Sequence, residues 1–236
     1  MKKLIVFPLV FFALFAGAQE AMNKTDIKDL YPKRFISSLE FLAGPSLVYT
    51  TGNKYIREDR QTKVGYILGI SVNHQINKRL DLNLRLSLER KGFKLASNAI
   101  DQSYTPPATE RLVQDLGQDY IGVSLLPRYY IDSKQRYYIG MGTYLAYLIK
   151  AKVSTYFHRN DTLLSHSVSY LDSHFSYNRL DWGINFQLGY NVKIKKEVAA
   201  TIQLLGNFGL INANKPDVLP TKFNSISLLV GILLHK

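Results

Sequence analysis

The 236-residue sequence contains no cysteine and one tryptophan, and its 18 acidic residues are outnumbered by 30 lysines and arginines. Without cysteine the fold has neither a disulfide framework nor a thiolate metal site. The length is sufficient to bury a sizeable core without such cross-links. Hydrophobic residues make up 46% of the chain, which excludes the collagen-like and intrinsically disordered classes.

Beyond residue 18 the sequence also has no long, uncharged apolar run, so we expect no helix that spans a membrane. A membrane β-barrel stays possible, because its apolar residues alternate with polar ones and dilute the mean hydropathy. No stripe of cations with interleaved aromatic residues is present, and no phosphate-binding glycine loop. We therefore expect no nucleic-acid partner, despite the formal net charge of +12.

The first 18 residues have the features of a secretory signal peptide. Lys2 and Lys3 precede an apolar stretch, and Ala16-Gly17-Ala18 forms a cleavage site before Gln19. The alternative is a membrane anchor, but the apolar stretch is too short for a helix that crosses the bilayer. Removal of the signal peptide lowers the net charge to +10 and places the protein outside the cytoplasm. We expect residues 19–37 to form a periplasmic leader and residues 38–236 to form the folded domain.

A period of two dominates that domain. Apolar residues at every second position from Leu80 to Leu88 alternate with polar ones, and the same pattern runs from Leu180 to Ile194. Such alternation predicts strands, whose successive side chains point to opposite faces. Eight strands are expected, at about 38–51, 64–75, 80–94, 120–131, 137–153, 180–194, 198–211 and 224–235. An even number is typical of single-chain outer-membrane barrels.

The expected connections alternate between short and long. Short turns are predicted at 77–79, 132–135 and 195–197, and longer loops at 52–63, 95–119, 154–179 and 212–223. Outer-membrane barrels place their short turns in the periplasm and their long loops outside the cell. The sequence thus predicts an all-β fold: an eight-stranded antiparallel up-and-down transmembrane β-barrel in a Gram-negative outer membrane.

The apolar face is expected to meet lipid, because it carries no ionised residue until the strand ends and the opposite face mixes glycine with polar side chains. Aromatic residues near the strand ends predict two girdles at the membrane surfaces. We expect Tyr49, Tyr66, Tyr147 and Trp182 in the outer girdle, and Tyr129, Tyr137 and Tyr190 in the inner one. The alternative is a secreted soluble barrel, which would point its apolar face inward around a ligand.

Three segments resemble a known family. Residues 120–130 (YIGVSLLPRYY), residues 138–148 (YIGMGTYLAYL) and Leu180-Asp181-Trp182-Gly183 are similar to the fourth, fifth and sixth strands of PorT-like outer-membrane β-barrel proteins of Bacteroidota. The resemblance covers residue 38 to the end of the sequence and implies the barrel fold. Gly122 and Ser124 depart from the glutamate and proline that the family often has. Some members assist type IX secretion, so the resemblance implies that role as an alternative.

Parity places a set of charged side chains in the lumen. We expect Glu40, Arg85, Glu89 and Arg128 in its lower and middle parts, and Lys150, Lys152 and Asp181 near the outer mouth. Charges in a narrow lumen should pair, because an isolated buried ion is costly. We expect them to form a salt-bridged plug; a small gated pore or a polar ligand site is the alternative.

The predicted third long loop holds His158, His166 and His174, with serines nearby. No pattern brings the histidines to one ion, so no metal or other cofactor is expected. A serine–histidine pair leaves a lipid-active enzyme as an alternative, although no nucleophile-elbow pattern occurs and no catalytic residue is assigned. We expect a non-enzymatic membrane scaffold or interaction module. Its expected partners are outer-membrane lipid and lipopolysaccharide, and proteins of the periplasm or the cell surface.

Overall fold

The computed structural model describes residues 37–52, 60–101, 108–160, 162–171, 178–212 and 221–235. All of them belong to one compact unit, Ile36–Lys236. The predicted signal peptide (residues 1–18) and, apart from Ser37, the predicted periplasmic leader (residues 19–37) lie outside the described residues. No helix in the described part of the chain is long and apolar enough to cross a membrane.

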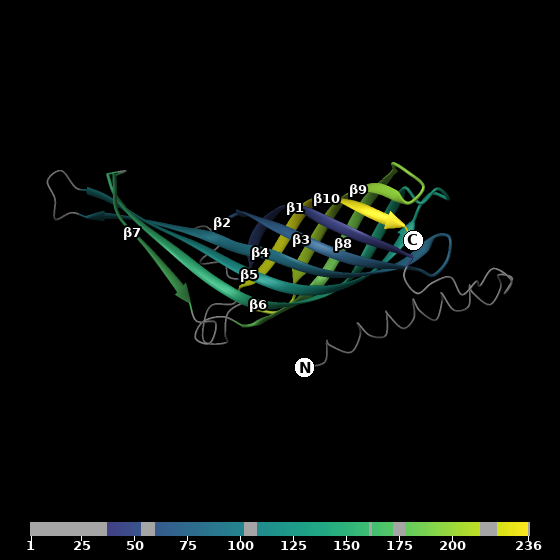
Figure 1. Cartoon of the computed structure of the whole chain (residues 1–236). Helices are drawn as coiled ribbons and strands as arrows, with labels where there is room; N and C mark the ends of the chain where they lie inside the picture. Colours follow the sequence, from purple (N-terminus) through teal and green to yellow (C-terminus); the bar gives the residue numbers. More distant parts are fainter. Residues whose placement is uncertain are drawn as a thin grey trace, which may run out of the picture. The chain divides into compact units, whose positions relative to one another are not determined.

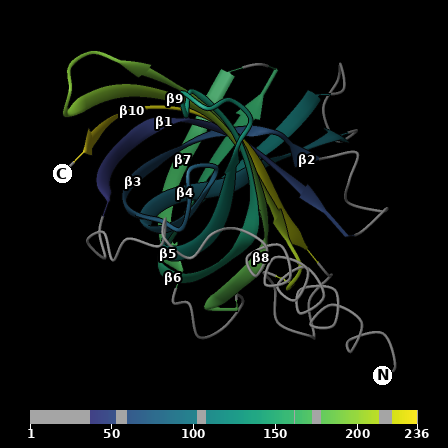
Figure 2. The same cartoon turned by 90° about the vertical axis from the view of Figure 1, so that its right-hand side faces the viewer.

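Eight antiparallel strands close into a ring (Figures 1 and 2). In ring order each strand pairs with the next, and the last pairs with the first. They are β4 (Leu80–Asp101), β3 (Lys63–Gln75), β1 (Ser38–Thr51), β10 (Lys222–His235), β9 (Val198–Gly209), β8 (Leu180–Lys193), β6 (Tyr137–Arg159) and β5 (Ala108–Tyr130). The predicted eight-stranded up-and-down barrel is confirmed. Two further strands, β2 (Arg60–Gln61) and β7 (Thr162–Leu171), pair with β4 and β6.

Side chains are sorted by parity along the barrel strands. On β10, Ile226, Leu228 and Val230 point outward and are about half exposed, while the alternate residues Ser227 and Leu229 are buried in the lumen. The apolar half of each strand therefore covers the outside of the ring. In lipid this arrangement is stable, because a closed ring leaves no backbone edge without a hydrogen-bond partner.

The short turns form where the sequence predicts them. At residues 77–79 the Asn77 side chain accepts hydrogen bonds from the backbone N–H groups of Arg79 and Leu80, each at 2.8 Å. At residues 131–136 the Asp132 carboxylate accepts bonds from the backbone N–H groups of Arg136 and Tyr137. Local side-chain bonds of this kind favour a turn over a continued strand.

The predicted long loops at 95–119 and 154–179 are wrong over their described residues. β4 and β5 stay paired as far as Asp101 and Ala108, and β6 continues to Arg159 with β7 beside it. Figure 1 shows β4, β5 and β6 running on past the other strands. We call this four-stranded sheet, residues 91–101, 108–118, 151–159 and 162–171, the extension. The sequence did not predict these strands, because both of their faces are largely polar or exposed. Apolar and polar residues therefore do not alternate clearly along them.

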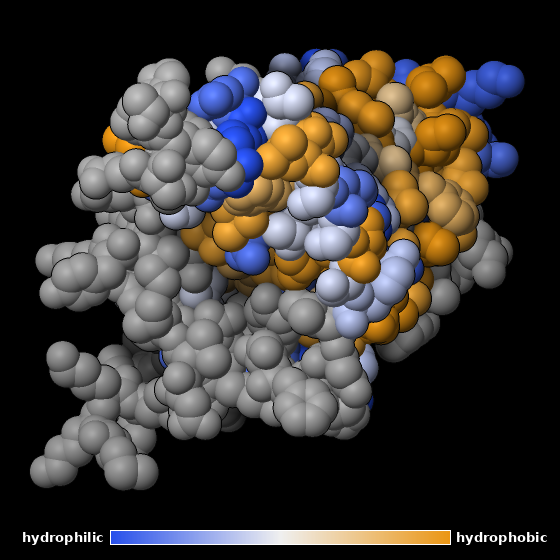
Figure 3. Space-filling view, turned by 90° about the vertical axis from the view of Figure 1, so that its left-hand side faces the viewer, coloured by the Kyte–Doolittle hydropathy of each residue, from blue (hydrophilic) through white to orange (hydrophobic). Residues whose placement is uncertain are grey.

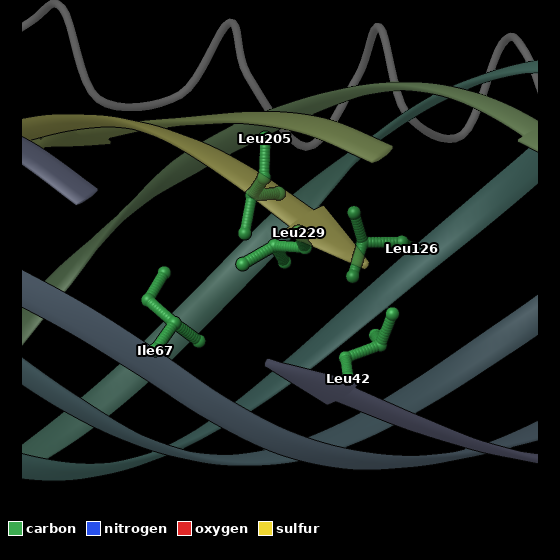
Figure 4. Close-up of a cluster of buried hydrophobic side chains, with 5 residues drawn as sticks. All are labelled: Leu42, Ile67, Leu126, Leu205 and Leu229. Atoms are coloured by element: carbon green, nitrogen blue, oxygen red, sulfur yellow. The ribbon is translucent and has the colours of Figure 1, made fainter. Parts of the chain in front are cut away.

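Inside the barrel, buried apolar side chains form a central layer. Leu42, Ile67, Leu126, Leu205 and Leu229 come from five strands and converge on one another (Figure 4). A second cluster of Val48, Phe93, Leu116 and Phe223 lies where the extension begins, with the Phe93 and Phe223 rings stacked at 6.3 Å. The lumen is therefore a packed interior.

Candidate functional site

Two groups of charged side chains fill the polar parts of the lumen. The first, which we call the turn-side cluster, contains Glu40, Asp81, Arg85, Arg128 and Gln203. Its members come from β1, β4, β5 and β9, and each is buried. Strand parity brings them together, because every one occupies an inward position near the short turns.

Arg128 is the centre of the turn-side cluster. Its Nε and Nη2 atoms donate to the two carboxylate oxygens of Asp81 at 2.8 and 2.9 Å, and its Nη1 donates to Glu40 at 3.3 Å. The guanidinium carbon lies 4.8 Å from the centroid of the Tyr138 ring. Tyr130 also donates its hydroxyl to Asp81 at 2.8 Å. A bidentate pair of this kind restricts both side chains to one geometry.

Gln203 joins this pair to Arg85. Its amide nitrogen donates to Glu40, and its amide oxygen accepts a bond of 2.8 Å from Arg85. Ser71 donates its hydroxyl to Glu40 at 3.0 Å. With Asn83, whose side-chain nitrogen lies 3.5 Å away, Glu40 accepts bonds from four different strands besides its own, which offsets much of the cost of burying its charge.

The second group, the mouth-side cluster, contains Lys91, Glu89 and Asp181. The Lys91 ammonium lies 2.7 Å from Asp181 and 3.4 Å from Glu89, and all three side chains are buried. The ammonium also lies 4.8 Å from the centroid of the Tyr144 ring. Ser225 donates its hydroxyl to Glu89 at 3.0 Å.

The clusters and the apolar layers alternate along the lumen. On β5 the inward side chains run from Arg128 through Leu126 and Tyr120 to Leu116, and on β4 from Asp81 through Arg85 and Glu89 to Phe93. One cavity lies between Arg85 and Glu89, and its volume of about 10 Å³ is the space of roughly one water molecule. Over the described residues the lumen is therefore filled mainly by side chains that come from opposite strands.

The structure places five of the predicted luminal charges inward and buried: Glu40, Arg85, Glu89, Arg128 and Asp181. The prediction that Lys150 and Lys152 point inward is wrong, because both are exposed on the outer face. Opposite them Tyr120 pairs with Leu148 and Asp119 pairs with Lys150, so Ile149 is an extra residue in β6. This β-bulge reverses the parity of every residue after it.

The predicted luminal set does not include three residues of the clusters: Asp81, Lys91 and Gln203. Asp81 and Lys91 occupy the same odd-numbered positions as Arg85 and Glu89, so extending that pattern in both directions would have found them. Gln203 carries no charge, and only the tertiary structure places it between Glu40 and Arg85.

The seven predicted girdle residues lie on the outward face, several of them beside an arginine. Arg179 donates to the Tyr147 hydroxyl at 2.6 Å, and the Arg90 guanidinium lies 5.3 Å from the Tyr66 ring centroid. Near the short turns, the Tyr137 and Tyr190 rings stack with their centroids 4.6 Å apart. Their role as girdles at the membrane surfaces stays a prediction. The remaining girdle residues are Tyr49, Tyr129 and Trp182.

The extension presents a different kind of surface. β7 pairs with β6 along one edge, and no described strand pairs with its other edge. Residues 162–170 are all exposed, and the strand has no lysine, arginine or carboxylate. Viewed from this end of the molecule, hydrophobic and hydrophilic patches lie side by side on the described surface (Figure 3).

The histidines and serines of this region do not form a described catalytic or metal-binding group. The His166 ring stacks on Tyr156 at 4.4 Å, and Ser165 and Ser167 are exposed on β7. His174 lies outside the described residues. Within the described ranges, no three histidine, aspartate or glutamate side chains gather closely enough to hold a metal ion.

A match to a known family agrees with this architecture. The family model described as outer membrane protein beta-barrel domain matches residues 29–214. Among solved structures, Neisserial surface protein A is 16% identical, with a TM-score of 0.45 over 84% of this chain and 97% of that one. OprG from Pseudomonas aeruginosa is 12% identical, with a TM-score of 0.38 over 85% of this chain and 96% of that one. No curated protein matches the chain significantly.

Proposed function

Since this chain belongs to the outer membrane protein beta-barrel domain family, we propose that it is a non-enzymatic interaction module, anchored in the outer membrane by a closed barrel. The extension would carry its binding surface. The observation that carries the proposal is the open, uncharged edge of β7, which stands beyond the barrel. An exposed edge strand is a template for pairing with another extended chain.

The orientation is part of the proposal. In outer-membrane barrels the short turns face the periplasm, which would place the extension outside the cell. Since the chain has no cysteine, one engineered cysteine gives a unique label. A membrane-impermeant maleimide should label Ser167→Cys on intact cells, and Lys134→Cys only after the outer membrane is permeabilised. Labelling in the reverse order would contradict the orientation.

Partner binding at β7 can be tested with the same label. A photo-crosslinker attached at Ser167→Cys on intact cells should give adducts to a specific protein, and one attached at Arg111→Cys on the central strand β5 should not. Adding Val168→Pro to the first variant should abolish the adducts, because proline interrupts strand pairing. Adducts of equal yield from both positions, or adducts that persist with proline, would contradict binding at the β7 edge.

The closed lumen supports a module that does not conduct. The buried side chains of the turn-side cluster, the central leucine layer and the mouth-side cluster follow one another along the lumen. In planar bilayers the native protein, Arg85→Ala and Glu89→Ala should all show negligible conductance. Discrete conductance steps by the native protein would favour the gated-pore alternative.

Two finer points rest on the sequence motifs. The barrel strands β5, β6 and β8 carry the segments that resemble PorT-like proteins, which supports membership of that branch and keeps a role in type IX secretion as an alternative. The N-terminal pattern supports signal-peptide removal after Ala18. The mass of the protein isolated from outer membranes would test the cleavage, because the mature chain should begin at Gln19.

A further inference from the structure

A group of basic side chains lies on the outward face where the apolar band of the barrel ends. The outward residues Leu86, Ile121 and Ile149 are about half exposed and belong to that band. Toward the extension, beyond Leu88 on β4, the next outward positions are charged. We call this group the basic patch, and it consists of Lys63, Arg90, Lys94, Lys150 and Lys152.

Strand register arranges the basic patch in rows across three strands. Arg90, Asp119 and Lys150 form the first row, and Lys152 lies in the second row beside Gly117 and Gly92. The glycines leave room for the Lys63 side chain, whose Nζ lies 3.4 Å from the position that a Cβ on Gly117 would take. Lys63 donates from there to the Leu116 carbonyl at 2.9 Å.

The basic patch has an excess of positive charge. Its five cations face two carboxylates, because Lys63 pairs with Asp115, and Arg90 binds Asp119 through two bonds of 2.6 and 2.8 Å. Within the described residues no ion pair is formed by Lys94, Lys150 or Lys152. The Lys150 ammonium lies 5.0 Å from the centroid of the Tyr170 ring, which keeps it on the outer face.

The β-bulge at Ile149 brings Lys150 and Lys152 into the basic patch. Without the extra residue, Lys150 and Lys152 would keep the parity of Tyr144 and Leu148 and point into the lumen, where Lys91 is already buried. With it, Ile149 extends the apolar band by one side chain and both lysines follow immediately on the same side. The result is a sharp boundary between an apolar surface and a cationic one.

We propose that the basic patch binds the phosphate groups of membrane lipid headgroups. One lipid molecule could place its acyl chains against the apolar band and its phosphates against the unpaired lysines, so a single ligand would satisfy both surfaces. The identity of the lipid rests on the orientation proposed above. In that orientation the basic patch lies at the outer leaflet, and the phosphates are those of lipopolysaccharide.

The test uses the full-length protein, purified in an uncharged detergent, with diphosphoryl lipid A as the probe. Native mass spectrometry measures how much lipid stays bound at each concentration. Lys150→Gln with Lys152→Gln should weaken retention roughly 30-fold, from roughly 5-fold for each lysine. The matched control is Lys195→Gln with Lys196→Gln in the opposite, exposed turn, which should change retention less than about twofold. Lys150→Arg with Lys152→Arg should keep binding.

Two arms identify the source of the phosphate. A dephosphorylated form of the same lipid should be retained as weakly by the native protein as by the double-glutamine variant. Inorganic phosphate at a concentration equal to that of the lipid should not displace lipid A, since it lacks acyl chains. Retention that is insensitive to the glutamines or to dephosphorylation, or complete displacement by inorganic phosphate, would overturn the proposal.

Folding and orientation do not obscure the result. Both lysines are exposed, so heat-modifiable gel migration should be the same for all variants. The assay in detergent depends neither on which side of the membrane the extension faces nor on a protein partner. Failure of the lipid proposal is therefore distinguishable from failure of strand pairing at β7.

Discussion

The two halves of β6 follow different rules. From Tyr137 to Leu148 the outward and inward positions alternate strictly, and the inward ones fill the lumen. From Ala151 the strand belongs to the extension, and most side chains on both its faces are at least partly exposed. In the barrel, burial of one face determines which residue types occur. In the extension that constraint is relaxed, which leaves its surfaces available for binding.

The largest effect is expected from a comparison of two arginine–carboxylate pairs, one in the lumen and one in the extension. Arg128→Met leaves Asp81 and Glu40 buried without their cation, and should lower the free energy of unfolding by about 3–5 kcal/mol. Arg159→Met in the extension removes a partly exposed partner of Glu110 and should cost less than about 1 kcal/mol. Urea unfolding in lipid vesicles measures both. Equal losses would mean that the luminal pair is hydrated.

A second comparison uses two leucines. Leu229 is fully buried in the central luminal layer, so Leu229→Ala should cost about 2–5 kcal/mol through lost contacts and a cavity. Leu163 on β7 is 52% exposed, and Leu163→Ala should change stability by at most about 0.5 kcal/mol. The same unfolding assay applies. A cost at Leu163 as large as that at Leu229 would show that the extension packs against another surface.

A third comparison uses two glycines. A Cβ on Gly189 would lie 2.0 Å from the Tyr138 ring, so Gly189→Ala should displace that ring from Arg128 and cost about 1–3 kcal/mol. A Cβ on Gly117 would meet only the flexible end of Lys63, so Gly117→Ala should be nearly neutral. Thermal unfolding, followed by gel migration, ranks the two variants. A neutral Gly189→Ala would show that the luminal packing can adjust.

The smallest expected effect concerns the exposed turn at residues 131–136. The bond from the Arg136 side chain, and then the backbone N–H donors, lower the pKa of Asp132 to about 2. A lowered pKa means that the charged form stabilises the fold above pH 4 and that this contribution disappears as pH falls through about 2. Asp132→Asn should therefore lower the melting temperature slightly at pH 5, and the difference should vanish near pH 2. A difference that grows on acidification would contradict this assignment.

The alternation in the sequence was enough to predict the barrel. Stretches such as Leu80–Leu88 have one face on the outside of the barrel and the other in the lumen, so each residue type reports its own environment. The turns at 77–79 and 131–136 could be predicted too, because asparagine and aspartate stabilise them locally. The paired strands of the extension could not, since neither face there is buried strongly enough to impose a pattern.

The sequence by itself determined which strand faces are apolar, and from them the number of barrel strands and the membrane location. The tertiary structure alone decided which charges meet. Arg128 binds Asp81 and Glu40, which lie 47 and 88 residues away in the sequence, because ring closure and strand register bring β1, β4 and β5 together. It also decided the side on which Lys150 and Lys152 lie, because one extra residue in a strand reverses parity without leaving a clear mark on composition.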